Sequence, residues 1–485
     1  MYPKNINSIV MTDWYAYLGA KLDRDTEVLK AFQSEVDYTL QKNRNRLCAA
    51  DTGNWFFHHP IYQKFQNGKG PHLLFLTAEA GGGKSTVMRT LTDKLTESIE
   101  PVLVAYFFFK DDDGRLSSYS DALSCLIYQL LVQEPKLTVH IRRFCEEHKF
   151  KVKHDTKLMW DVFSLIASNS PRDTFCVIDA IDECATATRP QLVADMKAFF
   201  QDPAKAGSRL KLIASSRPYQ DESHPYDSLF SKATKNMLHF VGEAAEVQPF
   251  IRGVIRTKAD ELVKEHELEP DIREMLVSRI IENNRHTRSF LAVQMAFELL
   301  GSHYRMHSGA DKNTVSLILD DIPNQLDRQF DELLNKSLDR EHARRIFCII
   351  LAARKTIKVR DLRVIYSLTK DKTSGNSVKP YEDLALPIDD EEFKQLVRAT
   401  CGLFITFVKT SVHLFHQTAR EHLLKRSETA TIVGPGHPLS ASAVPPDESS
   451  FWKNSISLQD ANLVCAAVCL DIISFPVSDE AAFKT

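Results

Sequence analysis

A glycine run followed by a lysine and two hydroxyl side chains is the stretch of this sequence best suited to chemistry. Its residues are Ala80, Gly81, Gly82, Gly83, Lys84, Ser85 and Thr86. Glycines let consecutive backbone N–H groups curve around an anion without interference from Cβ atoms, and a lysine beside them can reach the β- and γ-phosphates of a nucleotide. The Ser85 hydroxyl is placed to hold Mg²⁺ beside those phosphates. These residues therefore predict a site for ATP or GTP together with Mg²⁺.

The residues on either side predict the elements that would position this stretch. An apolar run at 73–76 is typical of a buried parallel strand, and apolar residues at helical spacing follow at Val87, Leu91 and Leu95. A strand, a glycine turn and a helix N-terminus in that order suit phosphate binding. The strict pattern has glycine where this chain has Ala78, a residue that disfavours a positive φ. The alternative is a glycine-rich turn that binds no ligand.

Three acidic residues follow a second apolar run, in the segment FCVIDAIDEC at 175–184. The run leads directly into Asp179, so its carboxylate is expected at the carboxyl end of a central parallel strand, where ligands bind in open α/β sheets. Asp179 is predicted to hold Mg²⁺ through water, and Asp182 and Glu183 are predicted to orient or deprotonate the water that attacks the γ-phosphate. The alternative is a turn that ends a strand and caps the next helix.

A third apolar run, LKLIAS at 210–215, ends just before Arg217. An arginine at the carboxyl end of a strand, beside the γ-phosphate, would sense or stabilise its charge. A further buried strand is predicted at 102–109, and segments 118–132 and 159–167 have the apolar spacing of helices. Strands and helices that alternate in this way favour a parallel α/β sheet.

Other clusters of polar residues have simpler explanations. The aspartates at 111–113 are consecutive, so a solvated loop is expected rather than a metal site. His58 and His59 lie in the aromatic segment 55–65, which is expected to pack in a core or to contact a base. The cysteines at 465 and 469 are one helical turn apart and have no accompanying pair, so core packing is expected.

Composition predicts an ordinary intracellular protein of two to four domains. The 485 residues are 43% hydrophobic and 26% charged, which is enough to bury more than one core. A formal net charge of −3 gives no overall attraction to nucleic acid or to an anionic membrane, so neither partner is expected. Nine scattered cysteines suit a reducing compartment, and no run of apolar residues is long enough for a signal peptide core or a membrane span. We therefore expect a cytoplasmic protein.

Several segments together carry a resemblance to a known family: WFFHHPIYQKF, LTAEAGGGKST, AYFFFK, LIYQLL, FCVIDAIDEC and LIASSRP. In this order they resemble the NACHT nucleotide-binding domain of the STAND class, in the fungal form also called the nephrocystin-3-like N-terminal module. Residues 324–368, TCGLFITF at 400–407 and the segment 412–425 resemble the helical and winged-helix regions that follow NACHT in that family. One departure is the segment HTRSF at 286–290, where the family has a Gly-x-Pro motif.

The resemblance implies a P-loop NTPase fold, with a parallel sheet flanked by helices and followed by helical and winged-helix domains. The predicted division of the chain follows from it and from composition, because Gly, Pro, Ser, Ala and Thr dominate the segment predicted as a linker. The predicted parts are an N-terminal helical lead-in (1–50), a NACHT domain (51–222), a helical domain (223–322), a winged-helix-like domain (323–426), a linker (427–450) and a C-terminal helical tail (451–485).

The resemblance also implies a function, a nucleotide-operated switch with slow hydrolysis. Its output would be assembly with protein partners or into a homo-oligomer, in non-self recognition or cell-death signalling. His416 lies where a short strand gives way to a helix, and in the family a histidine at this junction reaches the bound diphosphate. The alternative for His416 is a capping or core histidine. For the whole protein, the alternative is a scaffold that binds nucleotide without hydrolysis or does not bind it at all.

Overall fold

The computed structural model describes residues 25–34, 36–45, 54–78, 80–111, 114–148, 151–217, 236–241, 244–283, 289–306, 312–321, 326–337, 339–373, 389–424 and 452–473. The chain divides into two compact units, residues 1–250 and 251–485, which are described separately below. The predicted linker at 427–450 lies outside the described residues.

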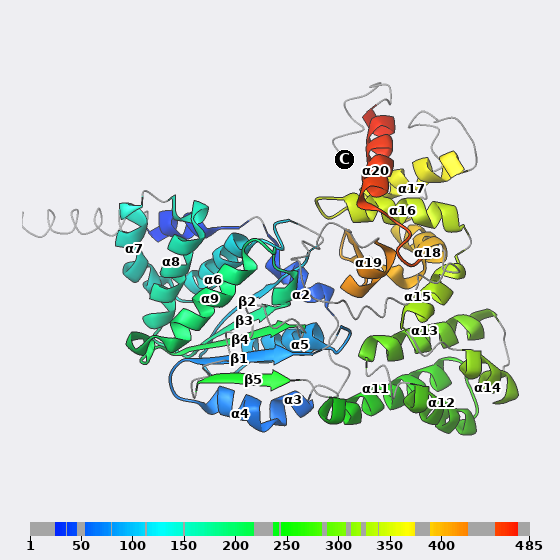
Figure 1. Cartoon of the computed structure of the whole chain (residues 1–485), viewed down its shortest axis with the longest axis horizontal. Coiled ribbons are helices and arrows are strands. Elements are labelled where there is room, and N and C mark those ends of the chain that lie inside the picture. The colour runs from blue at the N-terminus through cyan, green and yellow to red at the C-terminus, as the bar shows by residue number, and fades with distance from the viewer. Residues whose placement is uncertain are drawn as a thin grey trace, which may run out of the picture. The chain divides into compact units, whose positions relative to one another are not determined.

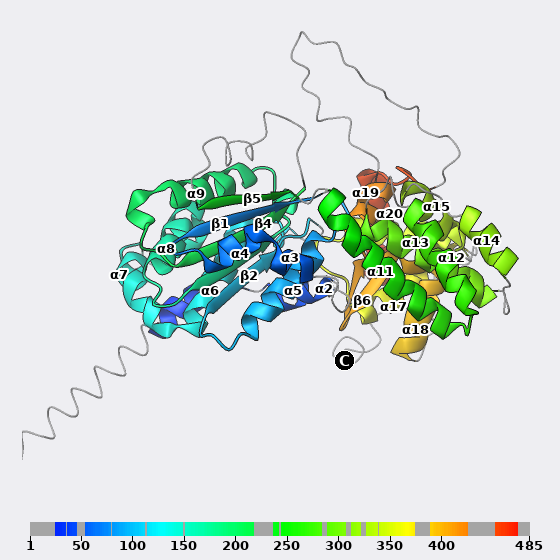
Figure 2. The ribbon, with the colours of Figure 1, turned by 90° about the horizontal axis from the view of Figure 1, so that it is seen from below.

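A parallel β-sheet forms the centre of the first unit (Figures 1 and 2). Among the described residues it has five strands: β1 (His72–Thr77), β2 (Leu103–Phe108), β3 (Thr174–Asp179), β4 (Leu210–Ser216) and β5 (Met237–Val241). Their order across the sheet is β2-β3-β4-β1-β5, and every neighbouring pair is parallel. β4 therefore lies between the strand that leads to the glycine loop and the strand that ends in Asp179.

Helices cover both faces of this sheet. They are α2 (Tyr38–Arg44), α3 (Asn54–His58), α4 (Pro60–Asn67), α5 (Lys84–Thr96), α6 (Tyr119–Gln133), α7 (Thr138–Glu147), α8 (Thr156–Ser168) and α9 (Arg189–Gln201), with a 3₁₀ turn, η3 (Ile181–Glu183), between β3 and α9. The strands alternate between two hydrophobic cores because successive side chains of a strand point to opposite faces. Leu73 and Phe75 of β1 join the core under α6 to α9, and Leu74 and Leu76 join the core under α3 to α5. The sheet is thus buried on both faces, as its continuous apolar runs predict.

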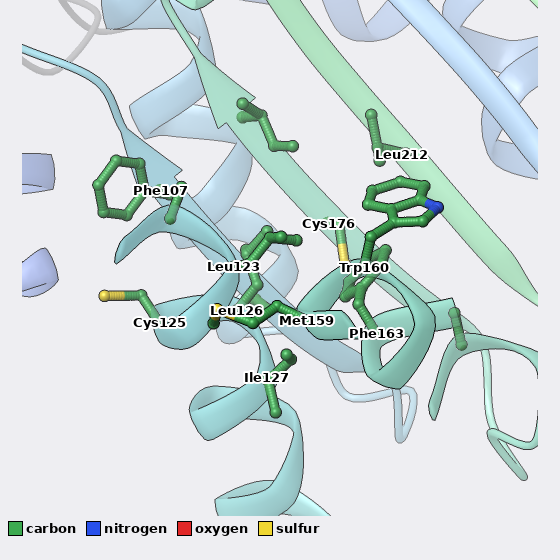
Figure 3. Close-up of a cluster of buried hydrophobic side chains, with 14 of the residues drawn as sticks. Phe107, Leu123, Cys125, Leu126, Ile127, Met159, Trp160, Phe163, Cys176 and Leu212 are labelled. Atoms are coloured by element: carbon green, nitrogen blue, oxygen red, sulfur yellow. The ribbon is translucent and has the colours of Figure 1, made fainter. Parts of the chain in front are cut away.

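The core under α6 to α9 includes side chains from helices and strands that are far apart in the sequence. Figure 3 shows Phe107 of β2, Leu123 of α6, Trp160 of α8 and Leu212 of β4 in one cluster. The same core takes in the described N-terminal residues, since Val28, Phe32 and Val36 are all buried in it.

The N-terminal residues are therefore part of the first unit, although the sequence suggested a separate lead-in. The Ser124 hydroxyl of α6 donates to the carbonyl oxygen of Phe32 at 2.9 Å, and the backbone carbonyl of Asn43 accepts from Arg89 on α5 at 3.3 Å. Lys42 forms an ion pair with Asp93, also on α5. These contacts attach residues 25–45 to the helix that follows the glycine loop.

The second unit is mostly helical. Its elements are α11 (Ala244–Glu265, which begins before the unit boundary), α12 (Pro270–Asn283), α13 (Phe290–Met306), α14 (Lys312–Asp321), α15 (Leu326–Asn335), α16 (Arg340–Ala352), α17 (Val359–Thr373), α18 (Asp390–Cys401), β6 (Ile405–Val408), β7 (Ser411–Leu414), α19 (Gln417–Leu423) and α20 (Leu458–Ile473). β6 and β7 form an antiparallel hairpin, and Lys358 makes an antiparallel bridge to Ser411 of β7. The winged-helix assignment of this region stays a prediction.

The described C-terminal residues, 452–473, pack on the second unit. Trp452 is fully buried, its ring lies edge-on to that of Phe347 in α16, and its Nε1 donates to Oδ1 of Asn335 at 3.1 Å. α20 contacts α16 and α17. None of the described helices is both long enough and apolar enough to cross a membrane.

Candidate functional site

The glycine loop connects the end of β1 to the start of α5. Gly81 and Gly83 adopt φ values of 73° and 81°, in the left-handed region that glycine enters at no steric cost. Gly83 is the N-cap of α5 and has no side chain to cap it, so the first N–H groups of the helix are left to other acceptors. The local requirement for positive φ explains why glycines, and not other small residues, stand at 81 and 83.

Ala78 does not create the backbone conflict that the sequence suggested. It is buried, and it is not among the described residues with positive φ. Its N–H donates to the carbonyl oxygen of Ser216 at 3.3 Å, which ties the start of the loop to the end of β4. An alanine at this position therefore costs nothing in backbone conformation.

Lys84 is the charged centre of the site. Its Nζ donates to the carbonyl oxygen of Ala78 at 2.6 Å. Burial lowers the pKa of Lys84, the carboxylates of Asp182, Asp179 and Glu183 act in the opposite direction, and Arg217 adds to the lowering. Electrostatic coupling of this kind requires proximity. The structure therefore gathers the side chains predicted from three separate motifs around one lysine.

Asp179 has one carboxylate oxygen that is satisfied and one that is not. The residue is fully buried, and Oδ1 accepts a hydrogen bond from the Ser215 hydroxyl at 2.6 Å. Its Oδ2 has no hydrogen-bond partner among the described residues. A buried carboxylate oxygen without a partner is costly unless a cation or a water completes it.

Mg²⁺ fits these residues as a partly protein-bound ion. Asp179 and Ser85 offer the oxygen ligands that Mg²⁺ prefers. Nowhere in the described residues do three His, Cys, Asp or Glu side chains group together as a metal site. Most ligands of the ion would then be water and nucleotide phosphate, which is the usual pattern for this ion.

Asp182 and Arg217, both predicted to act in hydrolysis, are paired with each other. Nε of Arg217 lies 3.2 Å from Oδ2 of Asp182, and the backbone N–H of Arg217 donates to Oδ1 at 3.2 Å. Both carboxylate oxygens of Asp182 are therefore in use. The pair links the turn after β3 to the end of β4.

Glu183 has the environment of a proton acceptor. Its Oε1 lies 3.8 Å from Nζ of Lys110, and Oε2 is buried with no hydrogen-bond partner in the described part of the chain. Burial raises the pKa of Glu183 to about 8, and Lys110 opposes that rise. A carboxyl group whose pKa is near neutral is suited to general acid or base catalysis.

Sequence reasoning missed Ser215 and Lys110. The Ser215 hydroxyl donates to Asp179 and accepts from the N–H of Ala180 at 2.9 Å, so it joins β4 to the end of β3. A possible signal was the pair of serines that ends an otherwise apolar strand. Lys110 is the first polar residue after β2, but its nearness to Glu183 depends on the pairing of β2 with β3.

The aromatic segment before β1 has a packing role. Phe56, Tyr62 and Phe65 are buried in the core under α3 to α5. His59 caps α4, since its Nδ1 accepts from the N–H of Ile61 at 3.2 Å, and His58 is exposed. Asp112 and Asp113 lie outside the described residues.

His416 lies in the second unit, at the start of α19. Its Nδ1 accepts from the backbone N–H of Thr418 at 3.0 Å, so it caps the helix. Capping was the alternative that the sequence left open, and the structure confirms this contact. A neutral imidazole that accepts at Nδ1 carries its proton on Nε2. The role of His416 toward a diphosphate stays a prediction.

Solved structures with a similar chain trace include two archaeal proteins. One is Cdc6p from Pyrobaculum aerophilum, with 11% sequence identity, a TM-score of 0.35 and coverage of 80% of this chain and 93% of that one. The other is the ORC2 protein of Aeropyrum pernix in ADPNP-ADP complexes, with 11% identity, a TM-score of 0.33 and coverage of 79% and 92%. Similarity this low carries no argument here, and the fold rests on the parallel sheet itself.

Sequence comparison finds relatives of the region that carries the glycine loop. The chain is 25% identical over 383 residues to the vegetative incompatibility protein HET-E-1 of Podospora anserina, a match that covers 77% of this chain and 26% of that protein. The chain thus spans about a quarter of the length of this relative. Residues 51–217 match the family model described as nephrocystin 3, N-terminal, a range that includes the glycine loop, the acidic turn and Arg217. Residues 51–217 are therefore similar to the nephrocystin 3 N-terminal family, in agreement with the resemblance to a NACHT-type STAND NTPase that the sequence motifs carry.

Proposed function

We propose that this protein binds Mg²⁺ with ATP or GTP, hydrolyses the nucleotide slowly, and uses its nucleotide state to control assembly with protein partners or with further copies of itself. One observation carries the proposal. Lys84, Asp179, Asp182, Glu183 and Arg217 converge at the carboxyl ends of β1, β3 and β4, which is where parallel sheets bind ligands.

Binding would use the glycine loop and Lys84. The backbone N–H groups of residues 80–86 and the N-terminus of α5 would surround the phosphates, and Lys84 would exchange its contact with the Ala78 carbonyl for the β- and γ-phosphates. Ser85 and Asp179 would hold Mg²⁺, the latter through water. A bound Mg²⁺ neutralises charge on the phosphates.

Hydrolysis would use Glu183, because Asp182 is already committed to Arg217. In the ionised form of Glu183, the unpartnered Oε2 is the oxygen that can accept a proton from water. Arg217 would keep its Nε on Asp182 and turn the rest of the guanidinium toward the γ-phosphate. Asp182 would then act through Arg217 rather than on the water.

The test is the nucleotide content and turnover rate of the purified full chain, with ATP and GTP compared. Glu183→Gln keeps shape and hydrogen bonding but removes the base, so phosphate release should slow about a hundredfold or more while affinity changes little. If the wild-type protein binds nucleotide and releases no phosphate, the chain is a nucleotide-binding scaffold. Absence of binding would make the module purely structural.

The switch itself would involve His416. An Nε2–H that donates to the β-phosphate of a bound diphosphate would stabilise a closed arrangement by about 1.5 to 3 kcal/mol, the range for a charge-assisted hydrogen bond. His416→Ala should then reduce the gain in melting temperature that diphosphate produces and should favour oligomers. A histidine that only caps α19 would lower the melting temperature equally with and without diphosphate.

The biological output is proposed from the relative and from the architecture it resembles. The similarity to a protein named for vegetative incompatibility, together with the family resemblance, supports a role in non-self recognition or cell-death signalling. A cytoplasmic location is proposed from the scattered cysteines. No nucleic-acid partner is proposed, since the net charge of −3 offers no overall attraction to a polyanion.

A further inference from the structure

The single turn η3, which carries Asp182 and Glu183, is short and has few hydrogen bonds of its own. It is entered through Ala180, a buried non-glycine residue in the left-handed region with φ 57° and ψ 57°. Its internal hydrogen bonds run from the N–H of Glu183 to the Ala180 carbonyl and from the N–H of Cys184 to the Ile181 carbonyl. A three-residue turn with a strained entrance keeps its shape only when the surrounding structure holds it.

Arg189 holds the backbone of this turn from outside. Its Nη2 donates to the carbonyl oxygens of Asp182 at 2.6 Å and Cys184 at 2.7 Å. Its Nε donates to the Cys184 carbonyl as well, at 3.1 Å. The planar guanidinium thus bridges the two carbonyls that lie on either side of Glu183.

The place of Arg189 in α9 argues that it serves the turn rather than the helix. It is the first residue of α9, and the positive end of a helix dipole disfavours a cation there. The N-cap Thr188 makes no capping hydrogen bond with its side chain. A neutral or acidic residue at this position would stabilise the helix better than an arginine does.

Other contacts also hold the turn on either side of Glu183. Arg217 holds the Asp182 carboxylate, and Ser215 accepts from the N–H of Ala180. With the backbone held by Arg189 as well, the position of the Glu183 carboxylate follows from the position of η3. Displacing a catalytic group by about 1 Å can slow a reaction about a hundredfold.

We propose that Arg189 is a positioning residue for nucleotide hydrolysis, acting through the carbonyls of Asp182 and Cys184 to fix the direction of Glu183. The inference rests on the proposed hydrolysis for its effect on rate, but not for its effect on the turn. Lysine cannot replace the guanidinium fully, because a single ammonium lacks the fork that spans two carbonyls.

Two measurements on the full chain test this role. Arg189→Gln and Arg189→Lys are compared with Arg209→Gln, a control that removes an exposed arginine donating to one carbonyl, that of Pro171, at 3.0 Å. Hydrogen exchange at the amides of Glu183 and Cys184 should accelerate about tenfold or more in Arg189→Gln, while β3 keeps its protection. The control should match the wild type.

In single-turnover hydrolysis, Arg189→Gln should be about ten- to a hundredfold slower with nucleotide affinity within about twofold of wild type. Arg189→Lys should recover part of the rate. Unchanged exchange at Glu183 and Cys184 would overturn the role of Arg189, and so would an equal loss of affinity, rate and β3 protection, which indicates general destabilisation. A different result would be faster exchange in Arg189→Gln together with no nucleotide hydrolysis by the wild type. That result would contradict the proposed hydrolysis but would support the contact of Arg189 with the turn.

Discussion

Two clusters of acidic and basic side chains, one in each unit, differ in how completely their groups are paired. The site cluster in the first unit consists of Lys84, Asp179 and Glu183. The clasp cluster in the second unit consists of His422 on α19, Asp327 and Asp331 on α15, and Lys453. Both place acids next to bases, but only the site cluster leaves carboxylate oxygens without a hydrogen-bond partner among the described residues.

The clasp cluster is satisfied by its own members. The His422 ring is buried, its Nδ1 lies 3.2 Å from Asp327 and its Nε2 lies 3.0 Å from Asp331. Lys453 lies 2.7 Å from the other oxygen of Asp327. The hydrogen bond from His422 holds the pKa of Asp327 well below its usual range, and the two carboxylates raise the pKa of His422 against the opposing effect of burial.

The site cluster shows the opposite behaviour. Burial is the largest influence on both Lys84 and Glu183, and it disfavours the charged form of each. Groups that neighbours do not fully compensate are poised to gain from a ligand that brings charge. We therefore expect the clasp cluster to stabilise its unit, and the site cluster to sacrifice stability for the phosphate and cation binding proposed above.

The largest expected effect separates the clusters by binding. Lys84→Ala should weaken Mg-nucleotide binding by about 3 to 5 kcal/mol, because it removes a desolvated charge from the phosphates, and should leave the free energy of unfolding nearly unchanged. Calorimetric titration measures this difference, and His422→Ala serves as the control that keeps wild-type affinity. Equal affinity of the Lys84 variant and the wild type would contradict the assignment of the site cluster to nucleotide binding.

The next effect is on stability. His422→Ala should lower the free energy of unfolding by about 2 to 4 kcal/mol, because it leaves Asp331 with no imidazole. The figure is below that of a fully buried pair, since the Asp327 side chain is 45% exposed and therefore partly screened. Urea denaturation of the full chain measures the loss, with replacement of the exposed His58 by alanine as the control. A loss below that of the control would show that the clasp cluster is not structural.

Both clusters should lose stability as pH rises, but over different intervals. Burial raises the pKa of Glu183 from the ordinary value of 4.5 to about 8 in the folded protein, so this residue's contribution to stability falls as pH rises through that interval. Glu183→Gln should remove the fall, which is at most about 5 kcal/mol. His422 behaves in the same sense: its raised pKa gives stability that is present at and below pH 6.5 and lost above the raised value.

Stability measured from pH 5 to pH 9 in the wild type, Glu183→Gln and His422→Ala separates these contributions. The free energy of unfolding of Glu183→Gln should increase relative to that of the wild type as pH rises from about 5 to about 8. The His422 variant should lose its disadvantage only at the alkaline end. Parallel curves for all three proteins would contradict the assignment of both residues.

The smallest effect concerns backbone strain. Ala180→Gly should stabilise the folded state by about 0.5 to 1 kcal/mol, because glycine adopts positive φ without a Cβ penalty. Lys409→Gly, in the exposed turn of the β6–β7 hairpin at φ 53°, should gain a similar amount. Only the Ala180 variant should slow hydrolysis, since its turn carries Glu183. Identical hydrolysis rates in the two variants would show that the strain has no role at the site.

The sequence was sufficient for the elements and residues whose signals are local. β1 to β4 coincide within about two residues with the predicted apolar runs, because a strand buried on both faces must be apolar along its length. The site residues from Lys84 to Arg217 could be proposed because each lies at the carboxyl end of a strand or in the loop that follows it. Parallel strands bring their carboxyl ends to one edge of the sheet. Positive φ at Gly81 and Gly83 was likewise a local requirement.

Only the tertiary structure decided which of these residues touch. The insertion of β4 between β1 and β3 places Ser215 on Asp179 and Arg217 on Asp182, and strand order depends on contacts between segments that are far apart in the chain. For the same reason, the sequence could not show that Val28, Phe32 and Val36 are buried in the first core, or that Trp452 is buried in the second unit. Amphipathic segments show that they will be buried, but not against what, because the partner surface exists only after the chain has folded.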